Sequence, residues 1–510
     1  MKRIISAVFA VILCISCIGM TVGCGDTADT ADTQAGGATT DAGGETEPVT
    51  EKDMTNEVEV PDITYDGAEF SVYMGGQGVG IGDKFNDFGE DNTDYVSVST
   101  EIFKRNQIIQ KQYDVKIVSY EEFATENGSG QSFVRVSEDW LSGNCSYSMY
   151  EVGTMAAANL ARSGYLLDLN STPYINLSKA WWDQGANRDL QIQGKMYYTT
   201  GDISVVDNLA THCIFFNKTL AKQLGINDLY TLVDEGNWTL DKYSEYVKMV
   251  SDDLDGNDVM DEHDRYGAII WNDSMQATLI GCDVRTCTIN GDGEIELTLY
   301  SDKSQDIVSR YTELCFDRST TYNYVIRLDS WQEWDPVRVG MFAGDQALFF
   351  KTILNTFGRL RNAEVDFGIL PYPKYNEAQA EYGSYVGASY SVMICMGGKM
   401  EESDIERNSA LIEAIAYHSG KMVTPEYYDE TLKGKLIRDE ESAPCLDIII
   451  GSRKFDTGIY YLIGHYTWDL TEMMKGERND FTVKYQQKFN DAIMEIEKLN
   501  ADFVKAGFEP

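Results

Sequence analysis

Residues 69–75 read Glu-Phe-Ser-Val-Tyr-Met-Gly, and residues 99–118 read Ser-Thr-Glu-Ile-Phe-Lys-Arg-Asn-Gln-Ile-Ile-Gln-Lys-Gln-Tyr-Asp-Val-Lys-Ile-Val. The first stretch alternates in polarity and ends at two glycines, which predicts a strand followed by a loop. The second begins with a capping serine and carries apolar residues at helical spacing (Ile102, Ile109 and Tyr113) before it turns into another strand. Strand, helix and strand in succession indicate an α/β layer with parallel strands.

The alternation of helices and short strands continues to the end of the chain. The spacing of apolar residues predicts helices over 217–224, 239–250 and 489–504. Short apolar runs at 347–350 and 367–370 predict strands. The chain that follows position 60 is long enough for two or three domains of about 100–200 residues each.

The N-terminus has the pattern of an export signal. Lys2 and Arg3 precede an apolar run, which Thr-Val-Gly-Cys closes at 21–24. This layout resembles the lipobox of bacterial lipoproteins, and the resemblance implies cleavage before Cys24 and diacylation of its sulfur. An ordinary signal peptide that happens to contain a cysteine is the alternative. Residues 25–59 have almost no large apolar side chain, which predicts a disordered tether.

The charge balance excludes one class of partner. The chain has 42 basic and 82 acidic residues and a net charge of −40. Removal of residues 1–23 takes away Lys2 and Arg3 and no acid, which leaves 40 basic residues against 82 acidic ones, a net charge of −42. Such a chain is repelled by nucleic acid and by an anionic membrane surface. We therefore expect no nucleic-acid partner, and membrane contact through the lipid anchor only.

The cysteines do not form a recognisable framework. Of ten, Cys14 and Cys17 lie in the predicted signal and Cys24 is the predicted lipidation site, so an odd number remains. A chain of this length does not need disulfides to fold. Cys282 and Cys287 are close enough in sequence for a local bridge, but their spacing alone does not show one. We expect mostly free, buried thiols.

One acidic loop has the ligand spacing of an EF-hand-like calcium site. Residues 253–264 read Asp-Leu-Asp-Gly-Asn-Asp-Val-Met-Asp-Glu-His-Asp, so oxygen-bearing side chains fall at loop positions 1, 3, 5, 9 and 12. Two departures are Asp258 in place of the turn glycine and aspartate in place of the last, bidentate glutamate. We predict a structural calcium ion, with an acidic surface loop as the alternative. The predicted ligands are Asp253, Asp255, Asn257, Val259 (through its carbonyl), Asp261 and Asp264.

Tryptophans beside acidic and amide residues are the other chemical signal. Sugar rings have apolar faces that stack on aromatic planes, and hydroxyls that bond to Asp, Asn, Glu and Arg. We assign Trp271 and one of Trp331 and Trp334 to a ligand cleft, and Trp181-Trp182 to packing. Core packing is the alternative for any one of them. Histidines at metal-ligand spacing, a G-x-S-x-G motif and a P-loop are all missing from the sequence.

A series of short stretches resembles a known family. In order along most of the mature chain, they resemble the sugar-type extracellular solute-binding lipoproteins of bacterial ABC importers, which are maltose-binding-protein-like. The matching stretches are Arg105-Asn106, 181–184, 194–202, 216–218, 230–239, 264–267, 342–348, 366–375 and 427–439.

The resemblance implies an α/β fold of the periplasmic-binding-protein type, with two lobes, crossing strands between them and a cleft that closes over a ligand. Each lobe is built from two separated stretches of chain. The predicted segments are a signal peptide (1–23), a tether (24–60), lobe 1 (61–208 and 366–425) and lobe 2 (209–365, with the calcium-like loop, and 426–510).

The resemblance also implies a function. A lipid-anchored monomer on the extracellular face of the membrane would capture a small solute, a mono- or oligosaccharide, and deliver it to ABC permease subunits without catalysis. An exported lipoprotein glycosidase or a surface adhesin is the alternative, because the carboxylates are too plentiful to pair by sequence. Ligands of α/β folds bind beyond the carboxyl ends of strands. On that basis the predicted ligand residues are Tyr73, Asp202, Asp207, Asn208, Trp271, Trp331 and Trp334.

Overall fold

The structure is a computed structural model, and it describes residues 57–76, 85–89, 95–122, 128–329, 331–429, 432 and 441–505. The predicted signal peptide, Cys24 and nearly all of the predicted tether lie outside these ranges. Within them, none of the helices has both the length and the apolar character needed to cross a membrane. All the described residues belong to one compact unit.

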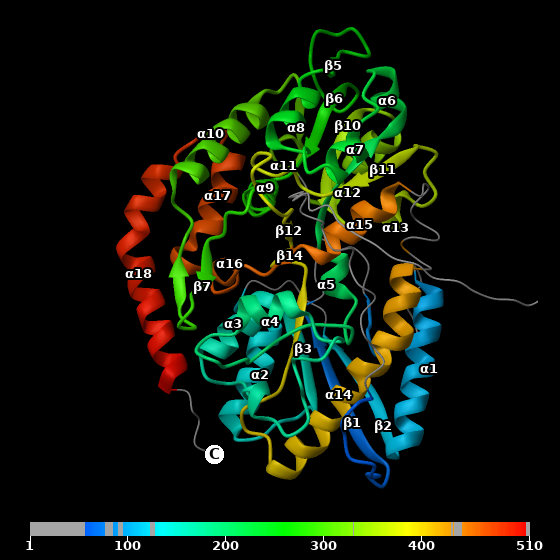
Figure 1. Ribbon diagram of the computed structural model, residues 1–510, viewed down its shortest axis with the longest axis vertical. Coiled ribbons are helices and arrows are strands. Elements are labelled where there is room, and N and C mark those ends of the chain that lie inside the picture. The colour runs from blue at the N-terminus through cyan, green and yellow to red at the C-terminus, as the bar shows by residue number, and fades with distance from the viewer. Residues whose placement is uncertain are drawn as a thin grey trace, which may run out of the picture. The chain divides into compact units, whose positions relative to one another are not determined.

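The first quoted stretch forms an inner strand of a four-stranded sheet. The strand order is β13 (Val392–Cys395), β3 (Met149–Gly153), β1 (Ala68–Gly75) and β2 (Val115–Glu122). β1 pairs in parallel with β2 and β3, whereas β13 is antiparallel to β3. α1 (Val96–Tyr113) joins β1 to β2 and lies beside α14 (Glu402–Pro425), as Figure 1 shows. α1 buries Ile102, Ile109 and Tyr113, so the predicted strand, helix and strand are confirmed.

A second, six-stranded sheet is mixed. Its order is β11 (Phe367–Leu370), β4 (His212–Asn217), β10 (Ala347–Ile353), β6 (Arg265–Ile270) and β5 (Ser251–Asp252), and β9 (Thr321–Asn323) also pairs with β6. β10 and β9 run parallel to β6, and β4 runs antiparallel to both of its neighbours, β11 and β10. All seven residues of β10 are buried, which explains the apolar run at 347–350, and Lys351 and Thr352 are buried with it.

Two small ladders and a set of helices complete the described chain. The ladders are β12 (Ser384–Tyr385) with β14 (Arg453–Lys454), and β7 (Cys287–Ile289) with β8 (Ile295–Leu297). The remaining α-helices are α2 (Gln131–Ser142), α3 (Thr154–Arg162), α4 (Gln184–Leu190), α5 (Val206–Leu209), α6 (Lys218–Gln223), α7 (Leu229–Asp234), α8 (Leu240–Val247), α9 (Ser274–Gly281), α10 (Asp302–Phe316), α11 (Tyr324–Arg327), α12 (Trp331–Ala343), α13 (Thr356–Leu360), α15 (Ser442–Gly451), α16 (Thr457–Tyr460), α17 (Tyr466–Lys475) and α18 (Phe481–Lys505). Two 3-10 helices are η1 (Leu169–Ser171) and η3 (Ile463–His465).

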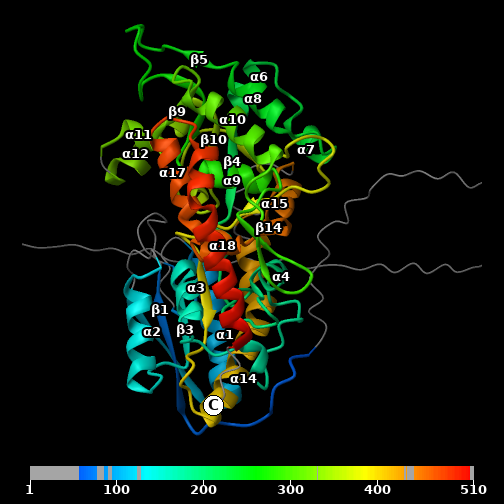
Figure 2. The same ribbon diagram turned by 90° about the vertical axis from the view of Figure 1, so that its left-hand side faces the viewer.

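The C-terminal helix confirms a sequence prediction and extends it. α18 buries Ala492, Ile496, Leu499 and Phe503 at helical spacing, and packs against α17, η3 and β8. Figure 2 shows α18 in full, running down from the level of α17. The helix begins at Phe481, eight residues before the predicted start, because Phe481 and Tyr485 also pack into the core.

Two described segments pass from one sheet to the other and lie hydrogen-bonded to each other. The first, residues 199–211, leads into β4, and the second, residues 384–391, leads from β12 to β13. A bridge between Thr211 and Val386 joins them, and Thr199 at the start of the first segment bridges to Ile394 of β13. We call the two segments the first and the second crossing.

The strand pairing differs from one predicted boundary. We expected lobe 1 to resume at residue 366, but β11 is hydrogen-bonded to β4 of the six-stranded sheet. The chain therefore returns to the first sheet after Leu370, through the second crossing. An apolar strand does not reveal from its own sequence which sheet it joins, because both sheets bury apolar strands.

Buried polar groups and thiols follow the sequence expectations. Trp181 and Trp182 are buried, and their indole nitrogens donate to the two oxygens of Glu413 at 3.0 and 2.9 Å. The packing role assigned to this pair is confirmed. All seven cysteines of the described chain are free, including Cys282 and Cys287, and all but Cys145 are buried.

Candidate functional site

The carboxyl ends of strands from both sheets come together around one turn of the second crossing. At the end of β3, the Thr154 amide donates to the Ser391 carbonyl at 3.2 Å, and the two hydroxyls lie 2.6 Å apart. Directly before Ser391, the ring of Tyr390 stacks on Trp271, the residue that follows β6, with the ring centroids 5.5 Å apart. Residues 387–391 therefore connect the end of β3 with the end of β6.

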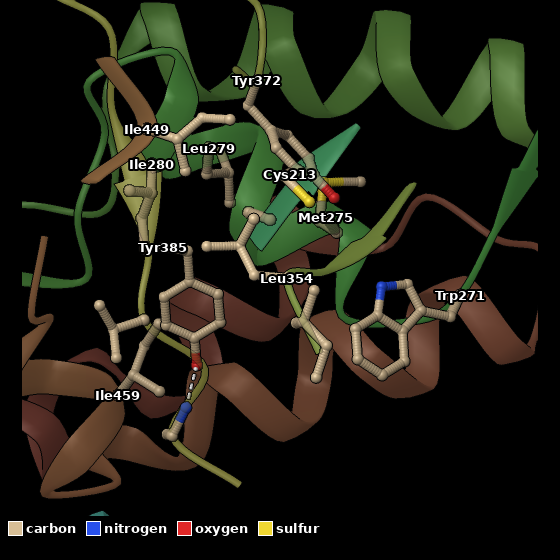
Figure 3. Close-up of a cluster of buried hydrophobic side chains, with 14 of the residues drawn as sticks. Cys213, Trp271, Met275, Leu279, Ile280, Leu354, Tyr372, Tyr385, Ile449 and Ile459 are labelled. Atoms are coloured by element: carbon tan, nitrogen blue, oxygen red, sulfur yellow. Dashed lines mark hydrogen bonds between the residues drawn. The ribbon is translucent and has the colours of Figure 1, made fainter. Parts of the chain in front are cut away.

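Trp271 belongs to a set of contacting rings that we call the aromatic stack: Tyr390, Trp271, His212 and Tyr385. The centroid of His212 lies 5.3 Å from that of Trp271 and 4.9 Å from that of Tyr385. Figure 3 shows Trp271 and Tyr385 in this region, with apolar side chains of α9 such as Leu279 and Ile280 close to Tyr385. Trp271 is only 5% exposed, whereas Tyr390 is half-buried.

The stack contains polar atoms that the described chain leaves without hydrogen bonds. Both ring nitrogens of His212 and the indole nitrogen of Trp271 are buried and find no hydrogen-bond partner among the described residues. Burial lowers the pKa of His212 to about 3, and the nearby Lys351 lowers it further in the same direction. The imidazole is therefore neutral near pH 7 and stacks as an uncharged ring.

Hydrogen-bonding side chains gather beside the stack. Asn272 and Asp273 follow Trp271, both are half-buried, and the Asn272 amide donates to Asp273 at 3.2 Å. Burial raises the pKa of Asp273 to about 6, with a small opposing effect of Lys475. From α12, the buried guanidinium of Arg338 lies 5.8 Å from the Trp271 ring and donates to the Tyr324 hydroxyl at 3.1 Å. These groups suit a ligand with both apolar faces and hydroxyls.

A cavity of about 420 Å³ lies beside α3, the helix that follows β3. On one side it is lined by Gly128, Ser129 and α3, and on the other by residues 460–468 and Glu495. Trp468 is 39% exposed there. Leu462 and His465 have left-handed φ angles of +54° and +53°, a conformation that costs non-glycine residues free energy and is enriched at functional sites.

The predicted ligand residues of the first crossing are occupied by partners within the protein. Asp207 is fully buried and accepts from Arg453 at 2.9 Å, and Asn208 accepts from the same guanidinium nitrogen at 2.7 Å. Arg453 also pairs with Asp183. Burial raises the pKa of Asp207 to about 6, and Arg453 opposes this. Asp202 is buried and accepts from Thr424 at 3.0 Å. The structure thus places these residues in a network that holds the crossing.

The other predicted ligand residues divide into two groups. Tyr73 is fully buried on β1, and its ring contacts Tyr147 and Tyr150 with centroids 5.4 and 6.2 Å away, so it lies apart from the aromatic stack in the interior of the first sheet. Trp331 and Trp334 belong to α12, but their side chains lie outside the described part of the structure. Only Trp271 is brought to the meeting point of the strand ends.

In the acidic loop at 253–264, carboxylate side chains accept hydrogen bonds from backbone amides of the same loop. Asp253 accepts from the amides of Gly256, Asn257 and Asp258, and the fully buried Asp264 accepts from Leu254 and Asp261. Oxygens of Asp253, Asp255 and Asp264 lie within 4.8 Å of one another. Asp258 has a φ of +61°, so the position at which a glycine was missing does adopt the left-handed turn. The carboxylate donor set fits a hard cation such as calcium.

Sequence reasoning missed Tyr390, Tyr385, His212 and Arg338, and it noted Asn272 and Asp273 only as neighbours of Trp271. One signal was available in the run Gly-Ser-Tyr-Val-Gly-Ala-Ser-Tyr-Ser at 383–391, where small residues alternate with two tyrosines. Small residues allow close packing of rings and backbone, as at Gly387. His212 carried no signal, because its role depends on partners that are distant in sequence.

Comparison with known proteins identifies the fold. No family model matches the chain, and no curated protein matches its sequence. Solved structures do: the galacto-N-biose and lacto-N-biose I-binding protein of an ABC transporter from Bifidobacterium longum has a TM-score of 0.55 at 12% identity, over 85% of this chain and 98% of that one. An ABC substrate-binding protein from Listeria monocytogenes, in complex with cycloalternan, has a TM-score of 0.53 at 13% identity, over 83% and 98%.

A third structure agrees with these two. The maltose/maltodextrin-binding domain from Bdellovibrio bacteriovorus, bound to maltotriose, has a TM-score of 0.51 at 12% identity, over 84% of this chain and 100% of that one. At such identities the likeness shows the fold. The predicted class, a two-lobed α/β fold of the periplasmic-binding-protein type, is confirmed, and it is the fold of ABC-transporter solute-binding proteins.

Proposed function

We propose that this chain is a membrane-anchored extracellular solute-binding protein that captures a carbohydrate and delivers it to the permease of an ABC importer. The observation that supports this most is the site at the meeting strand ends, where Trp271 and Tyr390 are flanked by Asn272, Asp273 and Arg338. Stacked rings beside amide, carboxylate and guanidinium groups match the two chemical faces of a sugar. The three structures with this fold named above are complexes with lacto-N-biose, cycloalternan and maltotriose.

The role we assign is binding without turnover. Retaining and inverting glycosidases need two carboxyl groups flanking the bond that is cleaved. At the proposed site Asp273 stands beside the amide of Asn272, Asp335 is paired with Arg338, and the carboxylates of the first crossing are held by Arg453 and Thr424. This arrangement favours a binding protein over the glycosidase alternative. The adhesin alternative predicts no small ligand in this site.

A thermal-shift screen tests the binding function. Purified protein is mixed with a panel of mono- and oligosaccharides that includes lacto-N-biose, cycloalternan and maltotriose. A saccharide at 100 times its dissociation constant is expected to stabilise the fold by about 2.7 kcal/mol. A panel without any stabilising saccharide would contradict the proposal.

The anchor rests on Cys24 and the sequence before it. We propose that the protein is cleaved at this position and held at the outer face of the membrane by lipid, and that it acts as a monomer. Cys24→Ala is expected to leave the protein uncleaved or released into the medium. Unchanged membrane retention of the variant would refute the anchor.

We further propose that residues 253–264 bind one structural calcium ion. The converging oxygens of Asp253, Asp255 and Asp264 support this, with Asn257, Asp261 and the Val259 carbonyl as the remaining predicted ligands. Chelation should lower the melting temperature of the wild type, and Asp253→Ala should remove the dependence on calcium. Identical melting with calcium and with chelator would show an acidic turn without metal.

A further inference from the structure

The turn at 387–391 is held firmly by hydrogen bonds. The Gly387 carbonyl accepts from the amides of Tyr390 and Ser391 at 3.1 and 3.0 Å, and from the Ser391 hydroxyl at 2.9 Å. The Gly387 amide donates to Ala210 of the first crossing at 3.0 Å. The Ala388 amide donates to the Tyr385 hydroxyl at 3.1 Å, the hydrogen bond drawn at Tyr385 in Figure 3. Tyr390 is therefore carried by a well-defined support between the two crossings.

Gly387 is required by the two rings that pack against it. A Cβ at this position would lie 3.2 Å from His212 Nε2 and 3.2 Å from Tyr390 Cδ2. Both distances are shorter than ordinary van der Waals contact, so a side chain here would push the rings away. The backbone of the second crossing thus takes part in the packing that positions Tyr390.

The members of the aromatic stack differ in exposure. His212 is fully buried, and Tyr385 and Trp271 are 4% and 5% exposed. Tyr390 is only half-buried. Burial is the main cause that raises the pKa of its hydroxyl; the charge of Asp273 raises this pKa further, and Arg338 opposes them. Because only 5% of Trp271 is exposed, its ring offers little surface to a solute. Tyr390 has both the accessible surface and the polar neighbours.

We propose that Tyr390 is the ring on which a bound sugar packs, and that Trp271 and His212 are positioning residues that hold Tyr390 in place. The inference rests on the proposed carbohydrate-binding function and refines it. The apolar face of a pyranose would lie on the Tyr390 ring, and its hydroxyls would meet the half-buried Asn272 and Asp273. Because Tyr390 belongs to the second crossing, its position is set by the connection between the sheets rather than by one sheet alone.

Calorimetric titration of variants tests this assignment. Lacto-N-biose, cycloalternan and maltotriose are titrated into the wild type, Tyr390→Leu, Tyr390→Phe and Trp271→Phe, and the saccharide that the wild type binds is carried through the series. Tyr390→Leu keeps an apolar side chain without a ring plane, and is expected to weaken binding by about 10- to 100-fold, the size of the base-stacking losses seen in other aromatic sites. Tyr390→Phe retains the ring and should stay within about threefold of wild type, whereas Trp271→Phe changes a residue that positions Tyr390 and should weaken binding by less than Tyr390→Leu does. Thermal melts of each variant confirm that it is folded, and Tyr390→His replaces the leucine variant if that one does not fold.

The outcomes separate this inference from the proposed function. If the wild type binds none of the saccharides in the titration or in the wider screen, the proposed function and this inference both fail. If the wild type binds and folded Tyr390→Leu binds equally well, only this inference fails. A larger loss from Trp271→Phe than from Tyr390→Leu would show that Trp271 itself contacts the sugar. A loss that is largest in Tyr390→Leu, with affinity retained in Tyr390→Phe, supports the assignment.

Discussion

The first crossing and the carboxyl end of β6 were both predicted to hold the ligand, and the structure gives them different chemistry. In the crossing, Asp207 and Asn208 are bonded to Arg453, and Asp202 to Thr424. At the end of β6, Trp271 and His212 keep buried nitrogens that have no partner in the described chain, and Asn272 and Asp273 are half-buried. Polar residues near a predicted cleft therefore do not by themselves mark a site. Buried polar atoms without a partner among the described residues occur in the network of the crossing too, at Arg453 Nε, so what distinguishes the end of β6 is the combination of stacked rings with the half-buried Asn272 and Asp273.

The largest expected effect concerns the crossing. Arg453→Met removes the cation shared by Asp183 and Asp207, both nearly fully buried, and leaves their carboxylates uncompensated. Breaking one partner of a buried ionic network costs about 3–5 kcal/mol, which urea unfolding would measure. Arg318→Met is the matched control, because Arg318 and Glu477 form a surface pair worth about 0–1 kcal/mol. Equal, small losses in the two variants would show that the crossing is not held by this network.

The next effect concerns the aromatic stack, and it is measured as the dependence of the unfolding free energy on pH. A buried base with its folded pKa depressed to about 3, from the usual 6.5, binds fewer protons folded than unfolded between these values. The contribution of His212 to the unfolding free energy is therefore fully present above pH 6.5 and is lost as the pH falls towards 3. Between pH 7 and 5 the wild type should lose about 2 kcal/mol of unfolding free energy through His212 alone.

His212→Phe is the control for the pH effect. The variant keeps a ring against Trp271 and has no proton to bind, so its unfolding free energy should fall by about 2 kcal/mol less than that of the wild type over the same range. Parallel pH profiles for the two proteins would mean that His212 is not held neutral in the stack. His212 would then have hydrogen-bond partners, as the polar residues of the crossing do.

The smallest effect concerns Asp273. Its pKa is raised to about 6, so below that pH the carboxyl becomes protonated and stops accepting from two sugar hydroxyls at once. Saccharide affinity should fall about tenfold between pH 7.5 and 5, because about nine in ten molecules are protonated at the lower pH. Asp273→Asn should bind with an affinity that does not change over this range. A wild-type affinity independent of pH would remove Asp273 from the contacts.

The sequence predicted local structure better than it predicted the site. The periodicity of 99–118 and the apolar runs in β10 and β11 sufficed for the elements, because burial imposes period and polarity directly on neighbouring residues. Tyr73 was chosen for its place near the end of a strand, but its side chain points into the packed interior. The direction of a strand side chain depends on its place in the alternation of the strand, and the loop that follows the strand does not reveal it. Trp271 was found because tryptophan is rare and followed a strand.

The remaining site residues depend on long-range pairing. His212, Trp271 and Tyr390 come from segments about 60 to 180 residues apart, brought together by the pairing of β4, β10 and β6 and by the bridge between Thr211 and Val386. Sheet order and the course of the crossings are not encoded in any local pattern. For the same reason β11 was assigned to the wrong sheet.

Native mass spectrometry of the protein with the saccharide selected by the screen tests the central claim most directly, namely that the chain captures a carbohydrate without altering it. The protein is incubated with the saccharide for several hours, the complex is weighed, and the saccharide is then released and weighed by itself. The account predicts one saccharide per chain, released with its mass unchanged. Shortened or hydrolysed products would identify an enzyme, and the absence of any complex with every saccharide of the panel would contradict carbohydrate capture.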